Sequence, residues 1–352
     1  MLLLIGSIGS SLRATELVQV ELRIVEIKGH TEEACKTFVQ TCQANKKDGM
    51  DDLLRIASTT RGLTEARTVF GVLLTTAPDT FATITALEKD VTRVFHLKPG
   101  LRPLKERKQE SDAELQLAYE EFGGANGGLK EIVSYQKVHT GPVPRCLFTS
   151  DPHTGGTSNI RHEGDAYSLQ VIFVQAAAVD DGRVTSRPLP GDGLTQIGLR
   201  MMDMEGENLQ ACENFYRKCE KPEPGNIDAV VRQASRVGGV KTIRASFNLD
   251  VAARLSTPVR IITSRGDKTV DIDMRVDNRD PITLALGIRE LFEVFDAKIP
   301  VENYLRTTLG LGGVPKLLRG GISNLKETLP DGTVRPKFEV TDILMMDGTV
   351  YP

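Results

Sequence analysis

The sequence predicts an α+β fold, built as a tandem duplication of one mixed sheet-plus-helices unit. The main observation is a cysteine motif, A-C-x-x-F-x-x-x-C, that begins at Ala34 and begins again at Ala211. A second observation is that strand-like and helix-like patterns follow one another in the same order around both motifs. Because self-similarity at one fixed spacing indicates a repeat architecture, we expect two copies related by a pseudo-twofold axis, over residues 1–178 and 179–352.

The spacing between the copies, set by Ala34 and Ala211, stays constant through the first part of each unit. Identical residues recur at this repeat spacing from Leu12 to Phe70. The recurring polar pairs are Arg23/Arg200, Asp51/Asp228 and Arg55/Arg232. Asp51 and Arg55 stand four positions apart, so an ion pair along one helix explains them. A site present in both copies is the alternative explanation.

Each unit is expected to begin with a strand and two helices. Apolar residues alternate with polar ones between Val18 and Ile24, which is the period of a half-buried strand. Helices are expected to begin near Thr31 in the first copy and near Asn208 in the second. A second amphipathic helix should follow in each copy.

The later parts of the two copies are less alike. In the second copy the pattern predicts a hairpin of Val259–Thr263 and Val270–Val276. Helices are expected over Glu110–Phe122 in the first copy and Pro281–Phe295 in the second. The apolar segment Met1–Gly6 is expected to be a strand, because it is short and lacks the charged start of a typical signal peptide.

The composition excludes several classes of protein. Apolar residues make up 40% of the chain and charged residues 26%, as in an ordinary globular protein. A net charge of −3 offers no overall attraction to nucleic acid or to an anionic membrane. Aromatic residues are 5% with no Trp, which argues against a carbohydrate groove or a base-stacking platform. No apolar run approaches the roughly 20 residues of a membrane-spanning helix, so no transmembrane segment is expected.

The cysteines are expected to be buried and reduced. Two cysteines seven positions apart on a helix are separated by about 10 Å along its axis, which is too far for a disulfide. They are therefore expected to pack as small apolar side chains. Reduced thiols are typical of a reducing compartment, so the expected location is the cytoplasm, or a virion.

The first copy carries an insertion near residues 139–165, rich in glycine and histidine. Its candidate catalytic residues are Asp151, His153, His162 and Glu163. Clustered His and carboxylate side chains in a glycine-rich loop can hold a metal or a phosphate. However, the spacing matches no metal signature and no P-loop is present. We therefore predict no metal and no cofactor, and a loop used for subunit contact is the alternative.

A basic stretch is the second candidate site. Its possible contacts to nucleic acid or another anion are Lys98, Arg102, Lys105, Arg107 and Lys108. Such a stretch can bind phosphates. The neighbouring acids Glu106, Glu110 and Asp112 dilute its charge, so a solvated linker is the other interpretation.

These observations favour a self-assembling structural protein, such as a viral or phage coat, tube or matrix-like component. The identities between the copies are mostly apolar, Gly and helix-face residues, which specify a scaffold rather than shared chemistry. The expected partner is the chain itself, as a homo-oligomer, because duplicated units lend themselves to symmetric assembly.

Two alternatives belong to other classes. One is an enzyme with its site at the Gly/His loop between the two units, although common catalytic motifs are missing. The other is a ring-shaped nucleic-acid clamp, in which Arg254, Arg260 and Arg265 would share a surface with the basic stretch.

Overall fold

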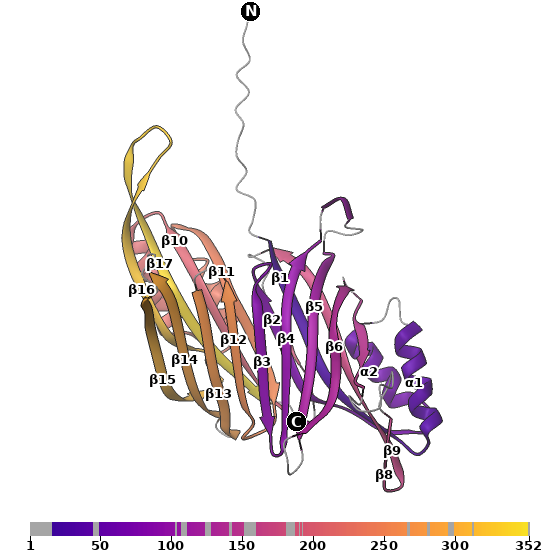
Figure 1. Cartoon of the computed structure of the whole chain (residues 1–352). Coiled ribbons are helices and arrows are strands. Elements are labelled where there is room, and N and C mark those ends of the chain that lie inside the picture. The colour runs from indigo at the N-terminus through magenta and orange to yellow at the C-terminus, as the bar shows by residue number, and fades with distance from the viewer. Residues whose placement is uncertain are drawn as a thin grey trace, which may run out of the picture.

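The computed structural model shows a molecule dominated by two large β-sheets (Figure 1). The described residues are 16–44, 49–102, 104–106, 111–123, 128–140, 143–150, 160–180, 187–189, 191, 193–265, 268–279, 282–294, 299–311 and 313–350. The segment Met1–Gly6, expected to be a strand, lies outside them.

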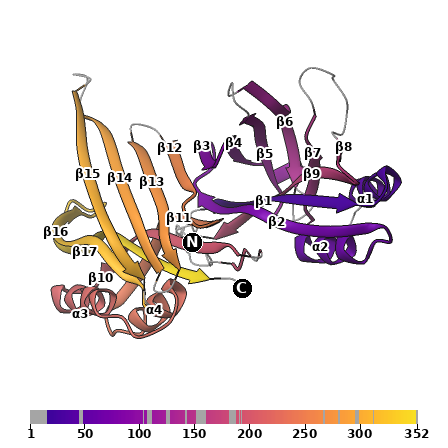
Figure 2. The same ribbon diagram turned by 90° about the horizontal axis from the view of Figure 1, so that it is seen from below.

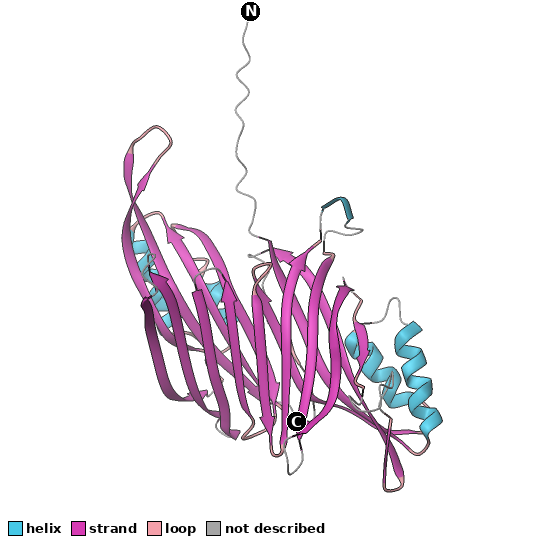
Figure 3. Cartoon of the chain, in the orientation of Figure 1, coloured by secondary structure: helices cyan, strands magenta, loops and turns pink. Residues whose placement is uncertain are grey.

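The predicted α+β class, with a mixed sheet-plus-helices unit, is wrong. Of the described residues, 65% are in strands and 16% in helices, with four α-helices among them, and both sheets are antiparallel (Figure 3). The helices form only a thin layer over one sheet, because most of the apolar surface is buried between the two sheets.

Among the described residues, the first sheet has nine strands. Eight lie along one path and β8 pairs beside β9. In spatial order the strands are β16 (Lys316–Thr328), β17 (Val334–Val350), β10 (Thr195–Gly206), β11 (Val240–Ala253), β2 (Leu63–Thr76), β1 (Glu16–Gly29), β9 (Ala166–Asp180) and β7 (Arg145–Phe148), with β8 (Arg161–Glu163) off the path.

The second sheet has eight strands in the described part of the chain and packs against one face of the first. In spatial order they are β15 (Ile299–Leu311), β14 (Ile282–Val294), β13 (Lys268–Arg279), β12 (Pro258–Arg265), β3 (Phe81–Glu88), β4 (Val91–Leu101), β5 (Ala113–Gly123) and β6 (Gly128–Thr140). The predicted hairpin in the second copy is confirmed, since β12 pairs with β13.

The two late helices predicted from the sequence are strands instead. The segment predicted as Glu110–Phe122 overlaps β5, and the segment predicted as Pro281–Phe295 contains β14. Along β5, every second residue from Ala113 is buried and the residues between are half-buried. This period of two matches a strand in a sheet with one buried face.

Four helices cover the outer face of the first sheet, near its opposite ends (Figure 2). They are α1 (Glu32–Ala44), α2 (Met50–Thr59), α3 (Leu209–Glu220) and α4 (Ile227–Ala234). The predicted helix starts are confirmed. Asn208 caps α3 by accepting from the Ala211 amide at 2.9 Å, which satisfies a backbone donor at the helix start. Among the described residues no helix combines the length and apolar character needed to span a bilayer.

The cysteines lie where the helices meet the sheet. The buried faces of α1 and α3 use matching positions of the repeated motif, and Phe38 and Phe215 are fully buried between their helices and the first sheet. All five cysteines are free thiols, and only Cys146 is partly exposed. The prediction of unpaired cysteines, buried in both motifs, is confirmed.

Strand β1 is buried on both faces, rather than half-buried as its alternation predicts. Val18 to Ile24 present their apolar side chains to the second sheet. On the other face, Val25 and Ile27 pack under α1 and α2. Gln19, Glu21 and Arg23 share that outer face and are also buried.

Both sheets continue from one half of the chain into the other. Strand β2 pairs with β11 in the first sheet, and β3 pairs with β12 in the second. At the centre of these pairings Leu73 lies opposite Asp250 and Ile84 lies opposite Ile261, and each pair has the same sequence separation as the two cysteine motifs. The order of strand, two helices and strand at the start of the chain also recurs from β10 to β11. The division between residues 178 and 179 stays a prediction.

Candidate functional site

The predicted catalytic loop is only partly described. Asp151 and His153 lie outside the described residues. His162 is exposed on β8 and its ring lies 4.7 Å from that of Tyr167, while Glu163 pairs through its backbone with Ala166. Within the described ranges, no group of three or more His, Cys, Asp and Glu side chains is arranged to hold a metal ion. The four candidates therefore stay a prediction.

The basic stretch is partly neutralised by nearby acids. Lys98 lies 3.7 Å from Asp79, and Arg102 approaches Glu106 and Asp112 at about 4 Å. Lys105 is exposed in a short 3-10 helix, Leu104–Glu106. Arg107 and Lys108 lie outside the described residues.

Two of the three arginines expected on a clamp surface are paired as well. Arg254 lies 2.7 Å from Glu88, and Arg260 lies 2.8 Å from Asp271. The side chain of Arg265 lies outside the described residues. These ion pairs lower the charge available to a nucleic-acid backbone.

The recurring polar pairs join a strand to a helix, not two turns of one helix. Arg23 Nη1 lies 2.6 Å from Asp51 Oδ1, and Arg200 Nη1 lies 2.5 Å from Asp228 Oδ1. The expected Asp51–Arg55 pair is not the one formed, since Arg55 pairs with Asp52 at 3.0 Å. The sequence spacing favoured a pair within one helix. The fold instead places the start of α2 over β1 and the start of α4 over β10.

Arg23 and Arg200 each have a further acidic partner, and these two partners lie on strands that do not correspond. Arg23 lies 2.6 Å from Glu21 on its own strand. In the second copy Gly198 stands at the position equivalent to Glu21, and the charge of Arg200 instead acts on Asp347 of β17. Asp347 Oδ2 accepts a hydrogen bond of 2.8 Å from the Ile227 amide at the start of α4. These contacts anchor the helices to the sheet, which is a structural role.

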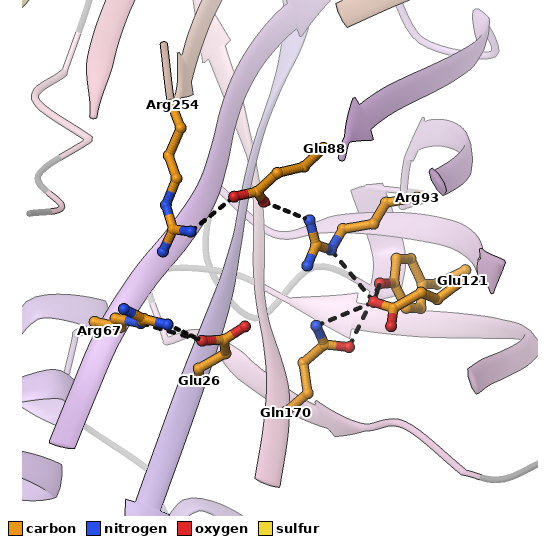
Figure 4. A network of polar contacts seen from close by, with 8 residues as sticks. Glu26, Arg67, Glu88, Arg93, Glu121, Gln170 and Arg254 are labelled. Atoms are coloured by element: carbon orange, nitrogen blue, oxygen red, sulfur yellow. Dashed lines mark hydrogen bonds and ion pairs between the residues drawn. The ribbon is translucent and has the colours of Figure 1, made fainter. Parts of the chain in front are cut away.

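A charged pocket lies between the two sheets in the first half of the chain (Figure 4). It has a volume of about 310 Å³. Its lining residues come from both sheets: Glu26, Lys28, Arg67, Val91, Arg93, Glu121, Lys130, Arg161, Ser168, Leu169 and Gln170. Sequence reasoning missed this pocket, because its residues are scattered over strands of both sheets and form no linear motif.

Ion pairs hold two arginines of the pocket in place. Arg67 contacts Glu26 through both Nε and Nη2, at 3.1 and 2.7 Å, and this bond raises the pKa of Arg67. Arg93 is buried and lies 2.9 Å from Glu88 and 3.3 Å from Glu121. The carboxylate of Glu121 is itself fixed by hydrogen bonds from the Tyr119 hydroxyl at 2.8 Å and from Gln170 at 3.2 Å. The walls of the pocket are therefore preorganised.

A broader groove of about 820 Å³ crosses the outer face of the second sheet near the junction of the halves. Its charged lining residues are Arg260, Asp273, Arg275, Asp277 and Arg306. Positive and negative side chains are interleaved, and Arg275 lies 2.6 Å from Asp277. With Asp271, which lies 2.8 Å from Arg260, the described side chains at the groove are three arginines and three aspartates, so this surface does not select an anion.

The ends of both sheets are the other notable surfaces. At one end β15 pairs only with β14 and β16 only with β17, within the described part of the chain. At the other end β7 pairs with β9, and β6 pairs with β5 and forms one bridge, from Ile132 to Ser150. Edge strands present backbone donors and acceptors that can pair with another chain.

Comparisons with protein-family models, with curated proteins and with solved structures give no match. The functional conclusion therefore rests on the geometry of these surfaces.

Proposed function

We propose that the chain is a self-assembling structural protein, a coat, tube or matrix-like component whose copies join edge to edge. The supporting observation is that both long sheets end in edge strands at both ends of the molecule. A structural subunit that joins in this way needs no catalytic residues. Its buried, free thiols suit the cytoplasm or a virion.

The strand directions favour head-to-tail joining. In the described part of the chain eight strands lie along the path of each sheet, and all neighbours are antiparallel. Because the number is even, the first and last strands run in opposite directions. A neighbouring copy can place its β6 beside β15 and its β7 beside β16, and both sheets then continue antiparallel. Such a heterologous contact closes into a ring or grows into a filament.

The hairpin of β16 and β17 extends this surface. Its pairs from Leu325–Lys337 to Thr328–Val334 lie beyond the last residues that pair β17 with β10 (Figure 1). Leu325 is 45% exposed and Val334 is 55% exposed. A two-stranded ribbon is marginally stable by itself. A second copy of the chain is the occupant that would bury it.

The first experiment measures mass in solution by light scattering. The natural chain is expected to form a discrete complex or long polymers. Leu325→Lys should weaken association by at least about tenfold, because it places a charge in the contact. Leu255→Lys is the matched control, since Leu255 is 42% exposed in the turn between β11 and β12, which are inner strands of the two sheets. A natural chain that stays monomeric at all concentrations would contradict the proposal.

The same measurement distinguishes head-to-tail from symmetric contacts. Tyr135 is 64% exposed on β6, at the opposite end from Leu325. In head-to-tail joining, Tyr135→Lys and Leu325→Lys each block the same contact, and an equal mixture should form a dimer with one intact interface. If Leu325 meets Leu325 of a second copy, Tyr135→Lys has no effect and the mixture yields only dimers of Tyr135→Lys. Adding nucleic acid to the natural chain tests the clamp alternative, which requires binding inside a closed ring.

A further inference from the structure

We infer that the charged pocket between the sheets is a binding site for a small phosphate-bearing anion, such as inorganic phosphate, pyrophosphate or a phosphate monoester. This inference is independent of self-assembly, because the pocket lies inside one half of one chain.

The first argument is the excess of positive charge. Lys28, Arg67, Arg93, Lys130 and Arg161 line the pocket together with two carboxylates, Glu26 and Glu121. Two more carboxylates lie beside it, Glu65 at 3.1 Å from Lys28 and Glu88 at 2.9 Å from Arg93. Among the described side chains, five cations therefore stand beside four carboxylates. Like charges gathered in a partly enclosed space repel one another, and a bound anion would offset that repulsion.

The second argument is the state of Lys130. Its side chain is half-buried on β6. Within the described part of the chain, no carboxylate lies within 4.0 Å of its ammonium group. Lys28, Arg67 and Arg93 have carboxylate partners that set their geometry, whereas Lys130 keeps its hydrogen-bond donors for a ligand. A compact ammonium group that acts as a point charge is well suited to phosphate.

Gly123 makes room for this lysine. A Cβ atom at Gly123 would lie 2.9 Å from Lys130 Nζ and 3.0 Å from the Asp90 carbonyl oxygen. An alanine at position 123 would therefore push the flexible end of Lys130 aside, and Gly123 leaves open the space that the ammonium group occupies.

The size and the polar lining agree with a small ligand. A volume of about 310 Å³ is at the lower end for ligand pockets. Ser168 and Gln170 line it together with the cations, so hydroxyl and amide donors are available. Arg67 is held by Glu26 through Nε and Nη2, so it contributes positive charge to the wall of the pocket.

The site belongs to the first half alone. At the repeat spacing, Arg67 has its counterpart in Arg244, but Lys28 is replaced by Glu205. Glu205 is engaged by Lys241 at 3.6 Å and Lys337 at 3.7 Å. At this position the second half therefore carries an acid where the first half carries a cation.

Isothermal titration calorimetry at low salt tests the site, with inorganic phosphate, pyrophosphate and glycerol phosphate as separate ligands. The natural chain is expected to bind one of them with a stoichiometry of one per chain. Lys130→Gln should weaken that binding by about tenfold, since it removes a charge-assisted contact. Gly123→Ala should weaken it as well, by displacing Lys130 without changing the charge.

Lys137→Gln is the matched control. Lys137 lies on the same strand, pairs with Glu114 at 2.7 Å and is not part of the pocket lining. The Lys137→Gln variant removes the same charge as Lys130→Gln and should leave anion binding unchanged within about twofold. Equal weakening by Lys137→Gln, or the absence of binding by all three anions, would overturn the inference. Light scattering on the same samples keeps this result separate from self-assembly.

Discussion

At the scale of single residues, Arg23 and Arg200 show how one structural need is met in two ways. Both guanidinium groups are buried on the outer face of the first sheet. The additional carboxylate is Glu21 on β1 in the first half and Asp347 on β17 in the second. Glu21 lies opposite Gln175, and Gly198 lies opposite Asp347. The acidic residue beside the arginine therefore lies on the same strand as the arginine in the first half and on the neighbouring strand in the second half.

Asp347 makes stability depend on pH. Burial raises the pKa of Asp347, although the Ile227 amide and Arg200 oppose this effect. A carboxyl group with a raised folded pKa stabilises the fold most when it is protonated in both states, below its unfolded pKa of about 3.9. That contribution is lost as the pH rises through the folded pKa.

Asp347→Asn should remove this dependence, because the amide does not titrate and its oxygen can still accept from Ile227. The free energy of unfolding of the natural chain minus that of the variant should fall as the pH rises from about 3.5 and then level off. Urea denaturation at a series of pH values measures it. A difference that stays flat would contradict the assignment.

At the scale of elements, the strands β5 and β14 show why local propensity misleads. Both contain Leu, Ala and Glu, which favour helices. Their apolar residues alternate, and neighbouring strands on both sides supply the backbone partners that a sheet requires. Tertiary pairing therefore overrides helix propensity in these segments.

The contacts that anchor α2 and α4 should differ in strength. The Asp228 side chain is 15% exposed, whereas that of Asp51 is 75% exposed. Asp228→Ala is expected to lower the free energy of unfolding by about 3 kcal/mol, because the buried Arg200 loses its partner. Asp51→Ala should cost about 0.5 kcal/mol, since the pair is exposed and Arg23 keeps Glu21. Chemical denaturation compares them, and equal losses would contradict this account of the helix anchors.

At the scale of the whole molecule, one core joins both halves. The largest apolar cluster includes Ile84 and Phe95 from the first half and Ile261 and Leu249 from the second. Both sheets also continue from the first half of the chain into the second, through the pairing of β2 with β11 and of β3 with β12. A shared core and continuous sheets favour one cooperative unfolding transition.

Phe38→Ala and Phe215→Ala test this cooperativity, because each creates a cavity under the helices of one half. Both side chains are fully buried, so each variant should lose about 3–5 kcal/mol. Calorimetry should show a single transition that moves to lower temperature in both variants. Two transitions, with each variant shifting only one, would mean that the halves unfold as independent domains.

The sequence by itself determined the helix starts, the buried thiols, the hairpin of β12 and β13 and the constant spacing between the repeated motifs. Each of these depends on neighbouring residues or on simple repetition. The repeat spacing recurs in the structure at the pairs Leu73–Asp250 and Ile84–Ile261.

Tertiary structure alone decided the all-antiparallel sheets, the partners of Asp51 and Asp228, and the charged pocket. The pocket joins side chains that lie far apart in the chain, from Glu26 on β1 to Gln170 on β9. Strand pairing sets which distant residues meet, and it depends on burying one shared apolar face rather than on any local pattern.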